Sequence, residues 1–248
     1  MNIAVCVRQT PDTTTQIQIS DNNSVVEDGI QWIINPYDEF AIEEAIKLTE
    51  THGGEVTIIS LGPARVEKTI REALAMGAHK AIRINTDDMP QDPGVIAAAL
   101  ADVLREGSYD VIFTGRQAID DDHSQVPSRL AQLLDLPCAT VVVELNIDGN
   151  TANALREVEG GHERVSFSLP AVIGANRHLN EPRYRSMRGI MQAKRIPIEV
   201  VEANLGDAQL SIESIAYPPE KGERKLFEAG ANDAAEVVRL LREEAQVI

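Results

Sequence analysis

Residues 56–84 read VTIISLGPARVEKTIREALAMGAHKAIRI, and this stretch predicts the fold class of the chain. The continuous apolar run from Val56 to Leu61 is typical of a strand that is covered on both faces. The next apolar positions share one face of a helix: Val66, Ile70 and Ala73. Gly77 can end that helix in a left-handed conformation, and a second apolar run from Ala81 to Ile84 follows it. A strand, a helix and another strand in this order indicate a parallel βαβ unit.

The same alternation extends to both sides of this unit. Further strands are predicted at Ile3–Val7, Val111–Thr114 and Ala171–Gly174. Further helices are predicted to start at Asn35 and to cover about 94–105 and 125–134. Because Asn35 precedes a proline and an early acidic residue, its side chain is expected to cap the first of these helices. The pattern predicts an α/β protein with a doubly wound, mainly parallel sheet and right-handed crossovers.

Two segments break this alternation and predict antiparallel excursions. Gln16–Val26 alternates around Asp21-Asn22-Asn23, which is typical of a small hairpin. Thr140–Phe167 predicts further antiparallel strands, with turns at Asp148-Gly149-Asn150 and Gly160-Gly161.

The chain after Arg195 follows a looser pattern. It contains an extended segment, a turn-rich stretch at 217–222 and a final helix over about 233–245. We therefore expect one α/β domain over residues 1–199 and an extended C-terminal arm over residues 200–248. Since the arm holds little apolar core of its own, it is expected to pack on another surface, such as that of a second chain.

The charge of the chain limits its partners. A formal net charge of -16 argues against nucleic acid, because phosphate binding needs an extended positive field. The opening MNIAVCV leads directly into a strand, and no apolar run approaches the roughly 20 residues of a membrane helix. Cys6 and Cys138 are too few for a disulfide framework or a metal site. We expect a cytoplasmic protein that is not itself a membrane protein.

Open α/β sheets bind ligands at the carboxyl ends of their strands, and three loops of this chain lie there. They begin at Arg8, at Gly62 and at Gly115, and they run to Asp12, to Ala64 and to Gln125. The third loop leads into a helix whose amides suit a phosphate group. None of the loops is a dinucleotide fingerprint or a Walker loop. The residues alone leave a nucleotide site and ordinary turns equally open.

The run Asp120-Asp121-Asp122-His123 allows a hard cation or an acid–base pair. The simpler interpretation is a solvated loop whose acids favour the positive end of the following helix. Cys6 lies in a strand, where a cysteine is usually a small buried hydrophobe. We identify no catalytic triad, base or nucleophile, and this pattern suits a protein whose chemistry belongs to a cofactor.

Several motifs of this chain resemble successive landmarks of the electron transfer flavoprotein beta subunit. They are NPYDE at 35–39, ALAMGA at 73–78, GRQAIDDD at 115–122, LPAV at 169–172 and NEPRYRSMRGIMQAK at 180–194. They keep the family's order and spacing from Val5 to about Glu199, which is about four-fifths of the chain. The resemblance implies an adenine nucleotide alpha hydrolase-like, Rossmann-like fold, and it implies that residues 1–199 form a nucleotide-binding domain.

The resemblance also implies a heterodimer in which an alpha subunit carries most of an FAD site and this subunit binds a structural AMP. The implied nucleotide-binding residues are Cys6, Asn35, Pro36, Tyr37, Asp38, Leu61, Gly115, Arg116, Gln117, Ala118, Ile119, Asp120, Asp121, Asp122, His123, Ser124, Gln125 and Val126. Tyr37 is further implied to lie near the FAD of the partner subunit. The C-terminal arm is expected to pack on that subunit.

The chain departs from the family pattern after the acidic loop. Ordinary members continue with Gln-Thr-Gly, whereas this chain has Gln125-Val126-Pro127, and proline has no amide hydrogen to offer a phosphate. A valine at this place also occurs in bifurcating relatives, which bind a second FAD in place of AMP and oxidise NADH. Those relatives have glycine where this chain has Asp121. We favour AMP, and a second FAD stays open.

The resemblance implies that residues 183–195 form a recognition loop that docks on partner dehydrogenases, with Met187 as its apolar anchor. The implied docking residues are Tyr184, Arg185, Met187, Arg188, Ile190, Met191, Lys194 and Arg195. A basic rim of this kind, which also includes Arg183, orients encounters with acidic surfaces. Arg183 has a second interpretation, in which it pairs with a carboxylate and fixes the base of the loop. From the residues alone, a basic helix with a buried stripe at Ile190 and Met191 is the simpler interpretation.

Three functional hypotheses remain open at this point. The first is a carrier subunit that accepts electrons from flavin dehydrogenases of the acyl-CoA dehydrogenase type and passes them toward a membrane quinone oxidoreductase, without catalysis of its own. The second is a bifurcating subunit with its own FAD that oxidises NADH. The third, from another class, is an autonomous adenine-nucleotide-binding enzyme or sensor, for which the chain lacks a recognisable phosphate loop.

Overall fold

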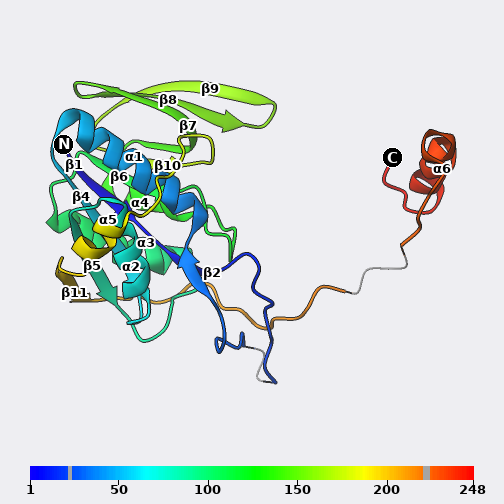
Figure 1. The fold of residues 1–248 in the computed structure, drawn as a ribbon, viewed down its shortest axis with the longest axis horizontal. Helices are drawn as coiled ribbons and strands as arrows, with labels where there is room; N and C mark the ends of the chain where they lie inside the picture. Colours follow the sequence, from blue (N-terminus) through cyan, green and yellow to red (C-terminus); the bar gives the residue numbers. More distant parts are fainter. Residues whose placement is uncertain (22–23, 220–223) are drawn as a thin grey trace. The chain divides into compact units, whose positions relative to one another are not determined.

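A nine-stranded sheet organises the larger part of the described chain (Figure 1). The computed structural model describes residues 1–21, 24–219 and 224–248. Along the sheet the strands are β11 (Ile198–Glu202), β5 (Lys80–Asn85), β4 (Glu55–Gly62), β1 (Asn2–Cys6), β6 (Val111–Gly115), β10 (Ala171–Ala175), β7 (Cys138–Asp148), β8 (Thr151–Val158) and β9 (Gly161–Ser168). The pairings from β11 through to β7 are all parallel, which confirms the mainly parallel sheet.

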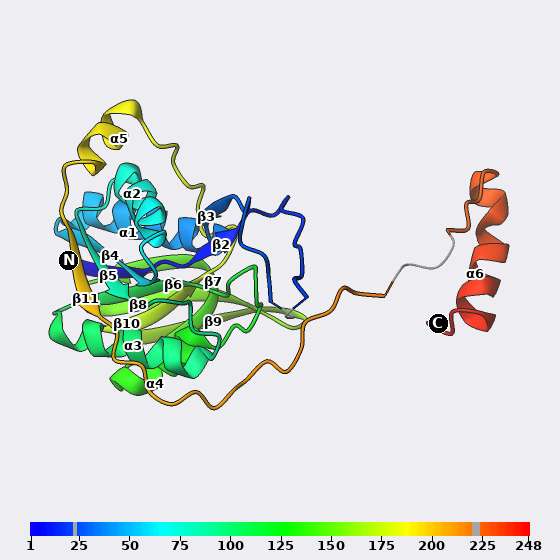
Figure 2. The ribbon, with the colours of Figure 1, turned by 90° about the horizontal axis from the view of Figure 1, so that it is seen from below.

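Two pairs of helices cover opposite faces of this sheet. They are α1 (Pro36–His52) with α2 (Val66–Met76), and α3 (Pro93–Glu106) with α4 (Val126–Leu134) (Figure 2). In β1, Ile3 and Val5 belong to the core under α1 and α2, whereas Ala4 and Cys6 belong to the core under α3 and α4. Because successive side chains of a strand point to opposite faces, this short run is apolar throughout. The doubly wound fold class is confirmed.

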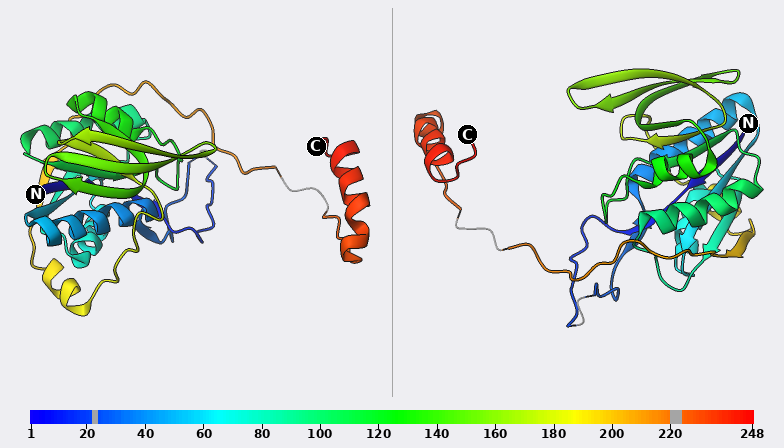
Figure 3. Two further views of the ribbon diagram at one scale, coloured as in Figure 1. Left: turned by 90° about the horizontal axis from the view of Figure 1, so that it is seen from above. Right: turned by 180° about the vertical axis from the view of Figure 1, so that it is seen from behind.

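The antiparallel excursion predicted after residue 140 extends one end of the sheet (Figure 3). β7 pairs in parallel with β10 on one side and antiparallel with β8 on the other, and β8 pairs antiparallel with β9. Gly149 and Gly160 occupy the two connecting turns with φ of 56° and 79°, a region that glycine enters at little cost. The two turns that the sequence predicts are therefore confirmed.

Three short strands were not foreseen from the sequence, whereas a short helix agrees with the basic helix that the sequence predicts near Ile190 and Met191. β2 (Gln9–Pro11) and β3 (Trp32–Ile34) form a separate antiparallel pair, and β11 adds an edge strand to the main sheet. α5 (Met187–Ala193) follows the strands of the excursion. The hairpin predicted over 16–26 is reduced to one antiparallel bridge between Ile19 and Val25, and part of its predicted turn, at residues 22–23, lies outside the described residues.

The structure divides the chain at other places than the expected boundary after residue 199. The larger unit contains Met1–Gln18 and Val26–Glu213, and the smaller contains Ile19–Val25 and Ser214–Ile248. The boundary differs because Ile198–Glu202 forms strand β11, which pairs with β5. Residues beyond 199 therefore still belong to the sheet.

The smaller unit has little internal packing. Within it, the amide of Ile19 donates to Tyr217 Oη at 2.9 Å. Its helix α6 (Ala234–Glu243) follows the 3-10 turn η1 (Gly230–Asp233) and agrees with the final helix that the sequence predicts. Val238 and Leu241 of α6 are exposed. The turn predicted over 217–222 lies partly outside the described residues. None of the described helices has both the length and the apolar character that crossing a membrane requires.

Phe113 of β6 lies at the centre of the sheet and is 0% exposed. We expect Phe113→Ala to lower the free energy of unfolding by about 3–5 kcal/mol, because it leaves a cavity in a close-packed core. Urea unfolding at fixed pH measures the loss. Val158→Ala at the exposed end of β8 is the control, with an expected change within about 0.5 kcal/mol. Equal effects of the two substitutions would contradict this assignment of the core.

Candidate functional site

A crevice opens where the order of the parallel strands reverses. From β1 the chain builds outward through β4 and β5, and it then returns to the other side of β1 with β6 and β10. No crossover covers the carboxyl ends of β1 and β6, and this is the place where open α/β sheets bind ligands. A cavity of about 600 Å³, which includes space open to solvent, lies there.

Most of the nucleotide residues implied by the sequence line this cavity. They are Cys6, Asn35, Asp38, Leu61, Gly115, Gln117, Ala118, Asp121, His123, Ser124, Gln125 and Val126. The remaining implied residues are not among the lining residues: Pro36, Tyr37, Arg116, Ile119, Asp120 and Asp122. Of the three loops expected at this edge, the second, Gly62–Ala64, does not line the cavity. Leu61, the residue just before that loop, still does. The first and third loops meet across the cavity.

Several lining residues were not assigned to the site from the sequence. They are Val7, Arg8, Met89, Ile96, Leu100 and Pro127. Ile96 and Leu100 lie four residues apart on the buried side of α3, a spacing that predicts a core face and carries no sign of a ligand. Arg8 follows the first predicted strand, and this position at the carboxyl end of a strand is the sequence feature that could have assigned it to the site.

The carboxylate of Asp38 holds three elements together beneath the cavity. It accepts hydrogen bonds from the Arg8 amide at 2.7 Å, the Gly115 amide at 3.0 Å and Asn35 Nδ2 at 2.9 Å. Burial raises the pKa of Asp38 to about 7, although these hydrogen bonds and the nearby charge of Arg8 act in the opposite direction. A Cβ at Gly115 would overlap Asp38 Oδ1, so glycine is required at this close approach.

Asn35 does not cap α1 with its side chain, contrary to the sequence prediction. Its Nδ2 donates to the Gln117 carbonyl at 2.8 Å, and its Oδ1 accepts from the Ile119 amide at 3.2 Å. The amide side chain is used to fix the loop after β6 because that loop passes directly over the start of α1. Local sequence could not reveal a partner 82 residues away.

The acidic loop forms ion pairs instead of being simply solvated. Arg8 Nη2 lies 2.7 Å from Asp120 Oδ2, and Arg8 Nη1 lies 2.8 Å from Asp121 Oδ2. Within the described residues, two buried nitrogen atoms of the residues that line the cavity, Arg8 Nε and His123 Nδ1, have no hydrogen-bond partner. Polar atoms of this kind are normally satisfied, and a bound polar ligand would satisfy them. Within the described residues, no group of three or more His, Cys, Asp or Glu is placed to hold a metal ion.

The lining combines an apolar wall with the start of a helix. Met89, Ile96 and Leu100 give an apolar wall, and α4 begins at the cavity with Val126. The first amides of a helix have no partner within the helix and attract anions, but Pro127 removes one of them. Burial raises the pKa of the Cys6 thiol to about 12, so this cysteine lines the cavity as a neutral group.

The segment at 180–196 has an exposed middle. Tyr184 is 99% exposed and Met187 is 77% exposed, and Met191 and Ile190 are exposed as well. The prediction that Ile190 and Met191 form a buried stripe is therefore wrong, because Ala193 is the one buried residue of α5. Figure 2 shows α5 projecting beyond α2, away from the sheet.

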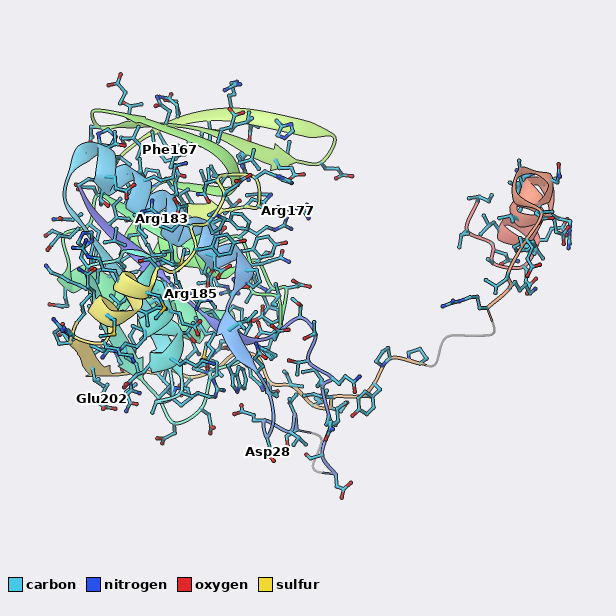
Figure 4. All side chains as sticks on the ribbon, viewed as in Figure 1. Asp28, Phe167, Arg177, Arg183, Arg185 and Glu202 are labelled. Atoms are coloured by element: carbon cyan, nitrogen blue, oxygen red, sulfur yellow. The ribbon has the colours of Figure 1, made fainter. Side chains whose placement is uncertain are left out.

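The basic residues of this segment fall into two groups. Arg183 pairs with Glu43 and Glu50, and Arg185 Nη1 lies 2.9 Å from Glu72 Oε2. Figure 4 labels these two arginines. Within the part of the chain that the structure describes, the other basic residues of the segment form no salt bridge: Arg188, Lys194 and Arg195. The interpretation of Arg183 as part of a free basic rim is wrong, since its charge is already used inside the protein.

The fold and the crevice define a doubly wound α/β protein with a cavity at its switch point. Residues 22–205 match the family model described as the electron transfer flavoprotein domain. The electron transfer flavoprotein subunit beta of Bacillus subtilis (strain 168) is 43% identical over 258 aligned residues, which cover 100% of both chains. The subunits named in the same way from Syntrophomonas wolfei and Homo sapiens are 39% and 36% identical over 89% of this chain, and the matches cover 87% and 90% of those proteins.

This chain belongs to the electron transfer flavoprotein beta-subunit family. Its function accordingly lies in electron transport by a flavoprotein.

Asp38 generates a pH prediction whose sign follows from its raised pKa. Between about pH 4 and 7 the folded state holds a proton on Asp38 that the unfolded state has lost, so this group lowers stability as pH rises. Asp38→Asn removes that dependence but also replaces one of the two oxygens that accept these hydrogen bonds with an NH2 group, which only donates. We therefore expect the substitution to reduce the free energy of unfolding more at pH 4.5 than at pH 7.5. Urea unfolding of both proteins at the two pH values measures this difference, and a larger loss at pH 7.5 would contradict it.

Proposed function

We propose that this chain is the beta subunit of a heterodimeric, cytoplasmic electron carrier. In this proposal an alpha subunit holds the FAD, which takes up electrons from flavin dehydrogenases of the acyl-CoA dehydrogenase type. The heterodimer then passes them toward a membrane quinone oxidoreductase. Membership of the family supports the role, and the match to the Bacillus subtilis protein over the whole of both chains supports it along the full length.

We propose that the crevice at the switch point binds AMP as a structural nucleotide. The observation that carries this proposal is the meeting of an apolar wall, Arg8 and the start of α4 in one cavity. The wall of Met89, Ile96 and Leu100 suits a purine ring. The unpartnered Arg8 Nε, the unpartnered His123 Nδ1 and the positive end of α4 suit a phosphate.

A second FAD in the same cavity is the alternative, and Val126 is the residue that favours it. Asp121 supports AMP, because it lines the cavity and its carboxylate is 2.8 Å from the Arg8 guanidinium. AMP and the diphosphate of FAD carry a similar negative charge, so the argument for AMP is that the Asp121 side chain occupies the position at which the second-FAD relatives have glycine. The proposal therefore keeps AMP as the resident nucleotide and the chain as a simple carrier.

The nucleotides released from the purified heterodimer test this assignment. We expect one FAD and one AMP for each heterodimer after denaturation, identified by absorbance and mass spectrometry. Asp121→Gly is the informative variant, because it removes the carboxylate while the other lining residues stay. Two FAD and no AMP in the unmodified protein would contradict the simple carrier and support a bifurcating subunit.

We further propose that the loop at 183–195 presents the surface that docks on the partner dehydrogenase. Met187 and Tyr184 offer exposed apolar surface, and Arg188, Lys194 and Arg195 offer positive charge in a chain of net charge -16. A flexible methionine suits a surface that accepts several partners, and local positive charge orients encounters with acidic ones. The C-terminal arm has a different role in this proposal. The exposed Val238 and Leu241 of α6 pack on the alpha subunit.

Met187→Glu tests the docking proposal. We expect the KM for the flavoprotein to rise by about tenfold or more when a substrate-reduced acyl-CoA dehydrogenase is the electron donor, because a charge replaces a buried contact in the complex. FAD, AMP and heterodimer content should stay unchanged, since this side chain is exposed in the isolated subunit. Leu133→Glu is the matched control on α4, which is also exposed and lies on the other face of the sheet. An unchanged KM for the Met187 variant would remove the docking role.

A further inference from the structure

The exposed segment at 180–196 is fixed at both ends. At the first end, Asn180 Nδ2 donates to the Phe40 carbonyl and to Glu44 Oε2, each at 2.9 Å. Three residues later, Arg183 returns to the same helix, α1. The segment therefore leaves the protein surface from a defined point on α1.

Arg183 forms the strongest of these attachments. Its Nε and Nη2 donate to the two carboxylate oxygens of Glu43 at 2.8 and 3.0 Å. Its Nη1 and Nη2 donate to the two oxygens of Glu50 at 2.6 and 3.0 Å. The backbone amide of Arg183 also donates to Glu43 Oε2, at 3.1 Å. A planar guanidinium can serve two carboxylates in this way, whereas a lysine ammonium is a single point of charge.

The environment of Glu43 makes this pair necessary for the local structure. The Glu43 side chain is 6% exposed, whereas that of Glu50 is 58% exposed. A buried carboxylate without its partner is strongly unfavourable, so Arg183 has to stay at this position. Bonds to Glu50 and Glu43 raise the pKa of Arg183, which keeps it charged. In contrast to Arg188 or Lys194, Arg183 has no free charge to offer a partner protein.

The second end of the segment is attached to α2. Arg71 donates from Nη1 to the carbonyls of Ala193 and Ile196, and Ala193 is buried. The backbone at Gly189 lies so close to the Ala75 carbonyl that a Cβ would overlap that oxygen. Between the two ends, Tyr184 and Met187 stay exposed.

We propose that Arg183 is a positioning residue for docking, which acts through Glu43 and Glu50 and does not touch the partner. It holds the segment in the shape that presents Met187, so that less conformational freedom is lost on binding. This inference rests on the docking function proposed above. It assigns to α1 the role of a rigid support for the recognition surface.

Three substitutions in the complete heterodimer test this role: Arg183→Gln, Arg183→Lys and Glu50→Gln. Two measurements are needed: hydrogen exchange of the amides at 184–192, and the KM and kcat with an acyl-CoA dehydrogenase reduced by its acyl-CoA substrate. We expect faster exchange and a KM raised by about tenfold for Arg183→Gln, the scale of one lost charge-assisted hydrogen bond, with kcat little changed. Arg183→Lys should recover part of the loss. Glu50→Gln, on the exposed side, should fold normally and raise the KM by about twofold.

The control is Arg164→Gln, which breaks the exposed pair of Arg164 with Glu144 at 3.8 Å and should change neither measurement. Unchanged exchange and KM in both Glu50→Gln and Arg183→Lys would overturn the positioning role. A lowered kcat with an unchanged KM would also overturn it. Met187→Glu separates this result from failure of the docking function. If that variant raises the KM and the Arg183 variants do not, docking stands and the positioning role is wrong; if neither raises it, docking itself is wrong.

Discussion

The buried carboxylate of Asp38 is the interaction on which the rest of the site depends. It joins the start of α1 to the ends of β1 and β6 through the amides of Arg8 and Gly115. These two strands flank the switch point, so the same carboxylate sets the width of the crevice and the position of both loops above it. A carboxylate can accept several amide hydrogens at once, and an alanine or a leucine here would leave those amides unpaired.

Helix α1 connects the crevice to the exposed segment at 180–196, on which we propose that the partner docks. Asp38 in its first turn serves the crevice, and Glu43 and Glu50 farther along hold Arg183. Its other faces pack in the core beneath the sheet, which makes the helix a rigid support. Two surfaces of different chemistry are thereby placed by one element. A change in the position of α1 would therefore displace residues of both surfaces.

The distribution of positive charge follows from these attachments. The chain has 23 basic and 39 acidic residues, and many of its arginines are paired within the protein. Arg8 is used in the crevice and Arg183 at the base of the docking segment. Arg188, Lys194 and Arg195 belong to the exposed segment and form no salt bridge within the described residues. In the docking that we propose, a partner surface meets a small positive area in a strongly acidic protein, which gives orientation over a range limited by the screening of charges in salt.

The sequence by itself determined the doubly wound fold, since the β-branched run of β1 and the spacing of Val66, Ile70 and Ala73 carry their own periodicity. It also determined the family and the loops that form the crevice. The tertiary structure decided which side chains act together: the use of Asn35 on a loop 82 residues away, the apolar wall from α3, and the pairing of Arg183 with Glu43 140 residues away. Local propensities act over a few residues, whereas these partners meet through the packing of the whole sheet, and this is the physical reason why the sequence pattern could not reveal them.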